Sequence, residues 1–273
     1  MTEPAAAPIG VFDSGMGGLT VLRALRAALP GEDFLYLGDT ARLPYGTKSP
    51  DTVQRYAVQA ARILVERGIK ALVVACNTAS AVALDALTER YAPLPVFGVV
   101  EPGAEAAAAL SGRGRVLVLA TESTVRGGAY QRALLARRPG LTVLARPCPL
   151  LVALAEEGRH AGPLVDLALA DYLRGMLPGD RGAVSSVLLG CTHFPVFRPA
   201  LEAILGRDGA TVVDSAETTA AALARRVGGA DLPAARGGAG RLSLLATDGA
   251  ERFRRVGRYF LGEPIPSVEL VDL

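Results

Sequence analysis

Short apolar runs alternate along the whole chain with longer stretches that mix apolar and polar residues. Apolar runs that end in a turn signal are typical of buried strands in a parallel sheet. We expect such strands at Pro8–Phe12, Phe34–Leu37, Ala71–Ala75, Val96–Val100, Val116–Ala120, Leu141–Ala145, Val187–Leu189, Thr211–Val213 and Leu242–Ala246. The stretches between them favour helices; Leu19, Leu22 and Leu25, for example, recur at helical spacing. Alternating strands and helices predict parallel sheets covered by helices on both faces.

The order of these elements predicts two domains. A strand ends near Val99–Pro102, and a second series of strand–helix units begins there. We expect the last strand, Leu242–Ala246, to return to the first sheet after a crossing near Asp214. The prediction is therefore an α/β fold with two similar domains, each a parallel-type sheet flanked by helices. Residues 1–98 and 214–273 would form the first domain, and residues 99–213 the second.

Composition narrows the class of protein. Half of the 273 residues are hydrophobic, which is enough for sizeable cores, and the formal net charge is only +2. Without a basic patch we expect no nucleic-acid partner. The N-terminal segment lacks the features of a signal peptide, and no apolar run approaches the ~18 residues of a membrane span. Three cysteines are an odd number, which favours free thiols and a cytoplasmic protein with no membrane partner.

The sequence also argues against two common cofactors. A pyridoxal enzyme needs a Schiff-base lysine, and neither of the only lysines, Lys48 and Lys70, lies in a promising motif. The turn from Asp13 to Gly18 matches neither common nucleotide-binding pattern. Because its glycines let backbone N–H groups converge at a helix start, this turn suits a carboxylate or phosphate group. An ordinary tight turn capped by Asp13 or Ser14 is the alternative.

Two cysteines carry the strongest chemical signal. Cys76 and Cys191 each end an apolar run and precede a polar turn, in the segments VVACNTAS and LLGCTHFP. A buried cysteine is usually a small hydrophobic residue, but both of these fall at strand C-termini, where open α/β sheets bind ligands. Helix N-termini lower the pKa of a thiol from about 8.5, and His193 could assist proton movement. A metal site made of Cys76, Cys191 and His193 lacks the usual ligand spacing, so we expect none.

Several other residues are candidates with an equally plausible structural role. The loop after the second strand contains Tyr45 and Gly46; it could expose backbone donors, with Tyr45 covering a pocket, or be an ordinary turn. Thr121 follows a strand and is either a helix cap or a ligand contact. Glu156 follows an apolar stretch, where a solvated helix face is the default. Cys148 lies between two prolines and is interpreted as structural.

Taken together, these segments resemble a known family. IGVFDSGMGGLTVL, YLGDTARLPYGTKS, VVACNTASA, VVEPG and LLGCTHFP are similar to the bacterial glutamate racemases of the aspartate/glutamate racemase superfamily, and the similarity spans the chain. LPYG replaces the CPYG form common there but keeps Tyr45 and Gly46. The resemblance implies two α/β domains that face each other across a cleft, with the active site between them. It also implies no cofactor, glutamate as substrate, and D-glutamate for peptidoglycan as product; we expect a homodimer as well.

The resemblance also assigns roles to residues. Cys76 and Cys191 would be the catalytic bases, Cys76 for D-glutamate and Cys191 for L-glutamate. Asp13, Glu156 and His193 would assist them by tuning the thiols or their protons. Substrate would be bound by Asp13, Ser14, Tyr45, Gly46, Asn77, Thr78, Thr121, Thr192 and His193. Some relatives that need a cell-wall precursor as activator carry longer leaders; only eight residues precede Ile9, so we expect activity with glutamate alone.

Three other functions remain open at this stage. A racemase for aspartate, a hydantoin or a related small acid would share the two thiols but have a different pocket. A binding protein on the same fold would bind glutamate without exchanging its α-proton. A zinc-dependent hydrolase would lose its activity when treated with a chelator.

Overall fold

The computed structural model describes residues 6–111, 114–176, 180, 183–206, 209–229, 232–235 and 238–273. In this part of the chain the strands form two sheets, one of six strands and one of four. The first sheet has the order β10 (Glu269–Leu270), β9 (Leu242–Ala246), β2 (Phe34–Gly38), β1 (Ile9–Asp13), β3 (Ala71–Val74), β4 (Val96–Gly98). The second has the order β6 (Thr142–Pro147), β5 (Arg115–Ala120), β7 (Ser186–Gly190), β8 (Thr211–Asp214). Every pairing between neighbouring strands is parallel.

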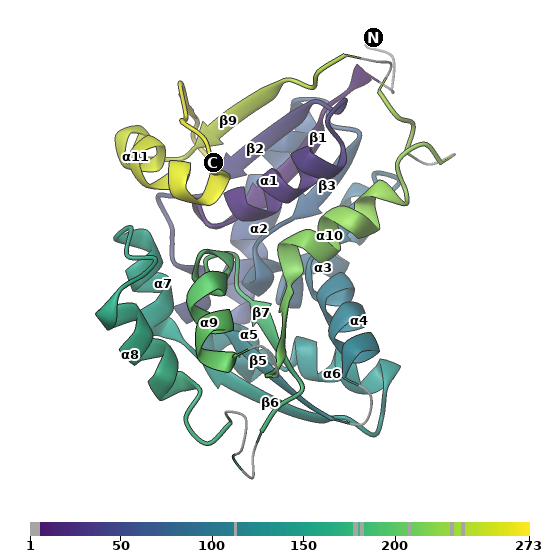
Figure 1. Cartoon of the computed structure of the whole chain (residues 1–273). Helices are drawn as coiled ribbons and strands as arrows, with labels where there is room; N and C mark the ends of the chain where they lie inside the picture. The colour runs from purple at the N-terminus through teal and green to yellow at the C-terminus, as the bar shows by residue number, and fades with distance from the viewer. Residues whose placement is uncertain are drawn as a thin grey trace.

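Helices cover both faces of each sheet, and the two sheets occupy separate halves of the molecule (Figure 1). The α-helices are α1 (Leu19–Ala28), α2 (Pro50–Glu66), α3 (Asn77–Tyr91), α4 (Val100–Leu110), α5 (Glu122–Gly127), α6 (Ala129–Arg137), α7 (Pro149–Glu156), α8 (Pro163–Tyr172), α9 (Arg198–Leu205), α10 (Ser215–Ala224) and α11 (Ala250–Leu261). Two short 3₁₀ helices are η2 (Tyr45–Thr47) and η3 (Phe194–Phe197). This architecture confirms the predicted α/β fold with helix-flanked parallel sheets.

The strands build cores on both of their faces. In β1, Ile9 and Val11 belong to one buried cluster and Phe12 to another, because successive side chains of a strand point to opposite faces. The first cluster continues into the second sheet through Leu117 and Leu119 of β5. One apolar core therefore runs across both halves and holds them together.

The strands of the first sheet come from residues 9–98 and 242–270, and those of the second from residues 115–214. The chain thus returns to the first sheet through β9, which pairs with β2 from Phe34 beside Leu242 to Gly38 beside Ala246. Helix α10 packs against both α1 and α4, at the crossing between the halves. The domain limits 1–98 with 214–273 and 99–213 stay predictions.

One predicted strand is shorter than expected. The run Val96–Val100 forms β4 only to Gly98, and Val100 already begins α4. The N–H of Val99 donates to the hydroxyl of Ser80, 3.2 Å away, instead of pairing with another strand. A single side-chain hydrogen bond therefore ends the strand before the apolar pattern does.

Candidate active site

Both motif cysteines lie at the carboxyl ends of strands, as the sequence predicts. One strand belongs to the six-stranded sheet and the other to the four-stranded sheet. Cys76 follows β3 and is the N-cap of α3, where its sulfur accepts the N–H of Ala79 at 3.5 Å. Cys191 directly follows β7 and precedes η3. The two side chains are almost fully buried, with 4% and 5% of their surface exposed. They lie close enough that charge on Cys191 raises the pKa of the Cys76 thiol, although burial is the larger cause.

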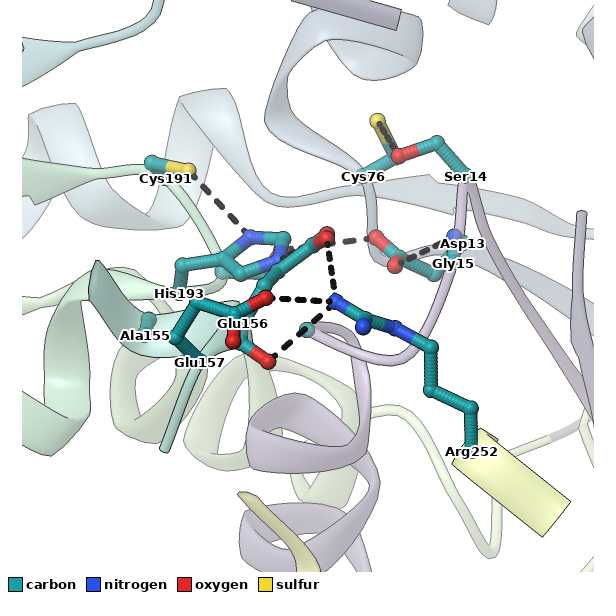
Figure 2. Close-up of polar contacts among 12 residues, drawn as sticks. Asp13, Ser14, Gly15, Cys76, Ala155, Glu156, Glu157, Cys191, His193 and Arg252 are labelled. Carbon is teal, nitrogen blue, oxygen red and sulfur yellow. Dashed lines mark hydrogen bonds and ion pairs between the residues drawn. The ribbon is translucent and has the colours of Figure 1, made fainter. Parts of the chain in front are cut away.

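Cys191 begins a chain of polar groups. The Cys191 sulfur lies 3.7 Å from Nδ1 of His193, and Nε2 of His193 lies 3.2 Å from a carboxylate oxygen of Glu156 on α7 (Figure 2). Burial alone would lower the pKa of His193, but the hydrogen bonds and charges of Cys191 and Glu156 outweigh it and raise the pKa to about 10. His193 is therefore a buried imidazolium at neutral pH, held between the sulfur of Cys191 and the carboxylate of Glu156.

Glu156 is not on a solvated helix face. Its side chain is only 14% exposed and contacts Arg252 of α11 as well as His193. Burial alone would raise the pKa of Glu156, but the His193 hydrogen bond, the His193 charge and Arg252 lower it overall. The default expectation for this position was wrong because His193 and Arg252, both distant in the sequence, contact the Glu156 carboxylate.

Cys76 has a different set of neighbours. The Cys76 sulfur lies 3.5 Å from the hydroxyl of Ser14 (Figure 2). Asp13 precedes Ser14 in the glycine-rich turn after β1. Asp13 is fully buried; one carboxylate oxygen accepts the N–H of Gly15 at 3.0 Å, and the other accepts the hydroxyl of Thr192 at 3.4 Å. Burial raises the pKa of Asp13, against the opposing effect of the His193 charge and three backbone hydrogen bonds.

The pKa of the Cys76 thiol differs from what its position at a helix start predicts. Burial, followed by the charge of Asp13, raises this pKa to about 12. The hydrogen bonds that Cys76 makes with Ser14 and Ala79 act in the opposite direction but are weaker. The lowering of the pKa that the helix N-terminus predicts is therefore outweighed, and Cys76 is a thiol at neutral pH.

The glycine-rich turn packs directly against the Cys191 motif. A Cβ added to Gly17 would lie 2.6 Å from the His193 ring and from the Thr192 hydroxyl. Thr20, on the first turn of α1, donates to the carbonyl oxygen of Thr192 at 2.9 Å. Only glycine permits this approach, so the turn that carries Asp13 and Ser14 is fitted to Thr192 and His193 of the other half.

A second cross-half contact surrounds the start of α3. Thr78 shares hydrogen bonds with Thr121, at 3.0 Å, and with Thr124, at 3.2 Å. Thr121 is also the N-cap of α5, as one of its two predicted roles requires, and its role as a ligand contact stays a prediction. A Cβ on Gly46 would lie 2.7 Å from Thr121. Threonine hydroxyls and the backbone of Gly46 are thus gathered where the two halves meet.

Asn77 makes contacts that sequence analysis did not anticipate. Its amide nitrogen donates to the hydroxyl of Tyr130 at 2.7 Å and lies 3.4 Å from the hydroxyl of Ser215. Among the described residues its buried amide oxygen has no hydrogen-bond partner. That oxygen is an acceptor available to an N–H group of a ligand.

Tyr45 does not cover a pocket with its side chain. The ring is 1% exposed, packs against Phe12 and Tyr56, and its hydroxyl donates to the buried carboxylate of Asp39. Asp39 also accepts from Arg42, which fixes the loop before η2. The main chain at Tyr45 and Gly46, and not the phenol, is the part of this motif that faces the other half.

A cavity of about 230 Å³ adjoins these groups. Its lining comes from both halves and includes Leu43, Pro44 and Gly46 on one side and Thr121, Val152 and Glu156 on the other. Most of the lining is apolar, and its polar side chains are those of Thr47, Thr121, Glu122 and Glu156. The cavity therefore lies where the two halves meet, beside Gly46, Thr121 and Glu156.

Two features are absent from the described residues: a cluster of metal ligands and a helix that could cross a membrane. No group of three or more His, Cys, Asp or Glu side chains there is arranged to hold a metal ion. In the same part of the chain, no helix has both the length and the apolar character that a bilayer crossing requires.

Comparison with known proteins identifies the family that this chain resembles. Residues 9–223 match the family described as Asp/Glu/Hydantoin racemase. The glutamate racemase of Geobacter metallireducens is 46% identical over 97% of this chain and 96% of its own length. The glutamate racemase of Thermus thermophilus, solved in complex with beta-chloro-D-alanine, is 44% identical with a TM-score of 0.87, over 100% of this chain and 99% of that one. That of Francisella tularensis, in complex with D-glutamate, is 34% identical with a TM-score of 0.89 and covers 98% of both chains.

Proposed function

The chain belongs to the Asp/Glu/Hydantoin racemase family, and we propose that it interconverts L- and D-glutamate by two-base proton transfer at Cα. The observation that carries the proposal is the pair of thiols at the ends of β3 and β7, each with its own acid–base partners. Inversion of a stereocentre needs a base on one face and an acid on the other. Full-length relatives that are glutamate racemases support glutamate as the substrate.

On the Cys191 side, the proposed base is a thiolate paired with the His193 imidazolium. His193 lies 3.7 Å from the sulfur and is itself held by Glu156. A cation next to a thiolate favours the ionised form. We assign this thiolate to removal of the α-proton of L-glutamate. When the reaction runs from D-glutamate, the same sulfur returns a proton as a thiol.

Cys76 has no counterpart of the His193 imidazolium among its neighbours described above, and we propose that the substrate provides the positive charge on this side. The thiol is held protonated by burial and by the Asp13 charge, which suits it to donate a proton to the carbanion formed from L-glutamate. For the reverse reaction Cys76 must ionise. The α-ammonium group of bound D-glutamate brings a positive charge that offsets the charge of Asp13, and the Asp13 carboxylate, whose own pKa is raised, accepts the proton that Cys76 releases.

The carbanion needs stabilisation, because its charge spreads onto the α-carboxylate. Preorganised donors at such a group are worth far more in a water-excluded site than in solvent. We assign this role to Ser14, Thr78, Thr121 and Thr192, with backbone N–H groups at Gly46 and at the start of α3. The free amide oxygen of Asn77 would accept a hydrogen bond from the substrate ammonium group.

We further propose that D-glutamate made here supplies peptidoglycan synthesis in the cytoplasm and that the protein acts as a homodimer. These proposals rest on the family to which the chain belongs.

The first prediction tests the reaction. Purified protein is expected to destroy the optical rotation of L-glutamate without added cofactor, because both bases come from the chain. EDTA and hydroxylamine should leave the rate unchanged, since neither a metal nor a pyridoxal carbonyl takes part. Polarimetry with each additive gives the answer. Strong inhibition by either would contradict the cofactor-free mechanism, and faster racemisation of L-aspartate than of L-glutamate would assign the enzyme to aspartate.

A second prediction concerns pH. With a His193 pKa of about 10, the imidazolium is present at neutral pH and is lost as pH rises through that value. We expect His193→Asn to lower kcat/KM roughly 10²-fold at pH 7, within the range for a positioned proton-transfer group. The ratio of wild-type to variant kcat/KM should then fall as pH rises through about 10. Titration of the substrate amine affects both enzymes and cancels in the ratio. A ratio that stays constant across this range would contradict the role of the imidazolium.

A further inference from the structure

Arg252 contacts Glu156 from the opposite half of the molecule. It lies on α11, directly after β9 of the six-stranded sheet, whereas Glu156 ends α7 beside the four-stranded sheet. One guanidinium nitrogen of Arg252 lies 3.6 Å from the second carboxylate oxygen of Glu156, 3.3 Å from its carbonyl oxygen and 3.5 Å from the carboxylate of Glu157. Figure 2 shows this side chain extending from α11 to the carboxylate that holds His193.

We infer that Arg252 is a positioning residue for the Cys191 side of the reaction: it holds Glu156 so that Glu156 holds His193 against the sulfur. The inference rests on the proposed function and names a residue that acts through others rather than on substrate.

The two oxygens of the Glu156 carboxylate have different partners, which supports this role. One oxygen accepts from His193, and the other faces Arg252. With only one oxygen engaged, a carboxylate at the end of a helix can rotate about its terminal bonds. A cation on the second oxygen restricts that rotation, and it also helps to keep Glu156 ionised. An ionised, fixed Glu156 is what a buried imidazolium requires.

The same helix contacts His193 directly. The ring of Phe260 packs edge-to-face on the His193 ring, with centroids 5.3 Å apart. Phe253, Val256 and Phe260 are buried, and α11 packs against α1. Helix α11 is therefore fixed to the half that carries Asp13, yet touches the Cys191 chain at both His193 and Glu156. Separation of the two halves would break these contacts, so the Cys191 side depends on residues from both halves.

The groups that face His193 are acidic, and Arg252 adds a positive charge to this cluster. His193 faces Cys191 on its own segment, Glu156 from α7 and Asp13 from β1. All three carry negative charge when ionised. Arg252 adds the second positive charge of the cluster and is partly shielded, with 43% of its side chain exposed.

A purely structural ion pair predicts a different result. Ion pairs with exposed partners contribute little to stability. Removal of such a pair would leave the ratio of the rates of proton transfer at Cys191 and at Cys76 unchanged. A positioning role instead slows one chemical step, the transfer at Cys191, and leaves the step at Cys76 alone.

The experiment compares Arg252→Gln, Arg252→Lys and the control Arg255→Gln, which removes an exposed arginine from the same helix. Rates are measured from L- and D-glutamate, each with protium or deuterium at Cα. We expect Arg252→Gln to lower kcat/KM roughly tenfold, the lower end of the loss seen when a partner that orients a reactive group is removed. The loss must be equal in both directions, because the enantiomers have equal free energy.

The isotope effects separate the two sides. If transfer at Cys191 becomes more rate-limiting, the deuterium effect on kcat/KM rises from L-glutamate, whose deuteron is taken by Cys191. From D-glutamate it falls, because the deuteron is then taken by Cys76 in the faster step. Arg252→Lys should recover part of the rate, and Arg255→Gln should match the wild type.

Two results would overturn the inference: an Arg252→Gln rate no lower than that of Arg255→Gln, or isotope effects that do not move in opposite directions. Failure of the proposed function is visible separately, because the wild-type protein would then show no glutamate racemisation before any variant is made.

Discussion

Serine in place of Cys76 or Cys191 is expected to reduce racemisation of glutamate by roughly 10³- to 10⁴-fold, the upper part of the range for loss of a positioned acid or base. A serine hydroxyl is close to a thiol in size but too weakly acidic to serve as the base at Cα. Both side chains are nearly buried, and the smaller oxygen fits the same space. Initial rates from L- and D-glutamate, followed by circular dichroism, measure the loss.

The third cysteine supplies the matched control. Cys148 is fully buried at the start of α7, and its sulfur donates to the carbonyl oxygen of Arg146 at 3.4 Å. Burial raises the pKa of this thiol to about 12, and a serine hydroxyl can make the same hydrogen bond. We expect Cys148→Ser to retain most of the activity. Near-wild-type turnover in Cys76→Ser or Cys191→Ser would exclude that residue as a base.

The fold was predictable because its signals are local. The apolar run Leu242–Ala246 has the same limits as β9, and Thr211–Val213 lies within β8. The errors lie where a distant group intervenes. Val99 leaves the sheet because Ser80 takes its N–H, and β10 is a two-residue exposed strand with no pattern to mark it. Local periodicity records which face of an element is buried, but not which side chain ends it.

The candidate site follows the same rule. Cys76, Cys191 and the turn at Asp13 stand at strand ends, so the topology of a parallel sheet was enough to indicate them. Arg252 could not be found in this way, because on an amphipathic helix it has the place of a solvent-facing residue. Its role depends on Glu156, which is distant in sequence. The raised pKa of Cys76 likewise depends on burial by the surrounding residues and on the charge of Asp13.

The strongest test of the mechanism is the fate of solvent protons. In D₂O, early in the reaction from L-glutamate, the D-glutamate formed is expected to carry deuterium at Cα. The remaining L-glutamate should stay almost entirely protiated. Two bases give this result because the proton taken by one thiol is not the proton delivered by the other. The mirror experiment from D-glutamate should give the mirrored pattern and serves as the internal control.

The structure favours two bases over one that swings between the faces. Cys76 is fixed as the N-cap of α3 and contacts Ser14, while Cys191 is fixed at the end of β7 and contacts His193. Both are nearly buried and are held by separate contacts, so we expect neither sulfur to reach both faces of Cα. A single swinging base would return label to L-glutamate or carry the original proton into the product. Mass spectrometry of the separated enantiomers at low conversion distinguishes the cases: substantial protium in D-glutamate would rule out the two-thiol mechanism, whereas deuterium confined to the product requires a second base.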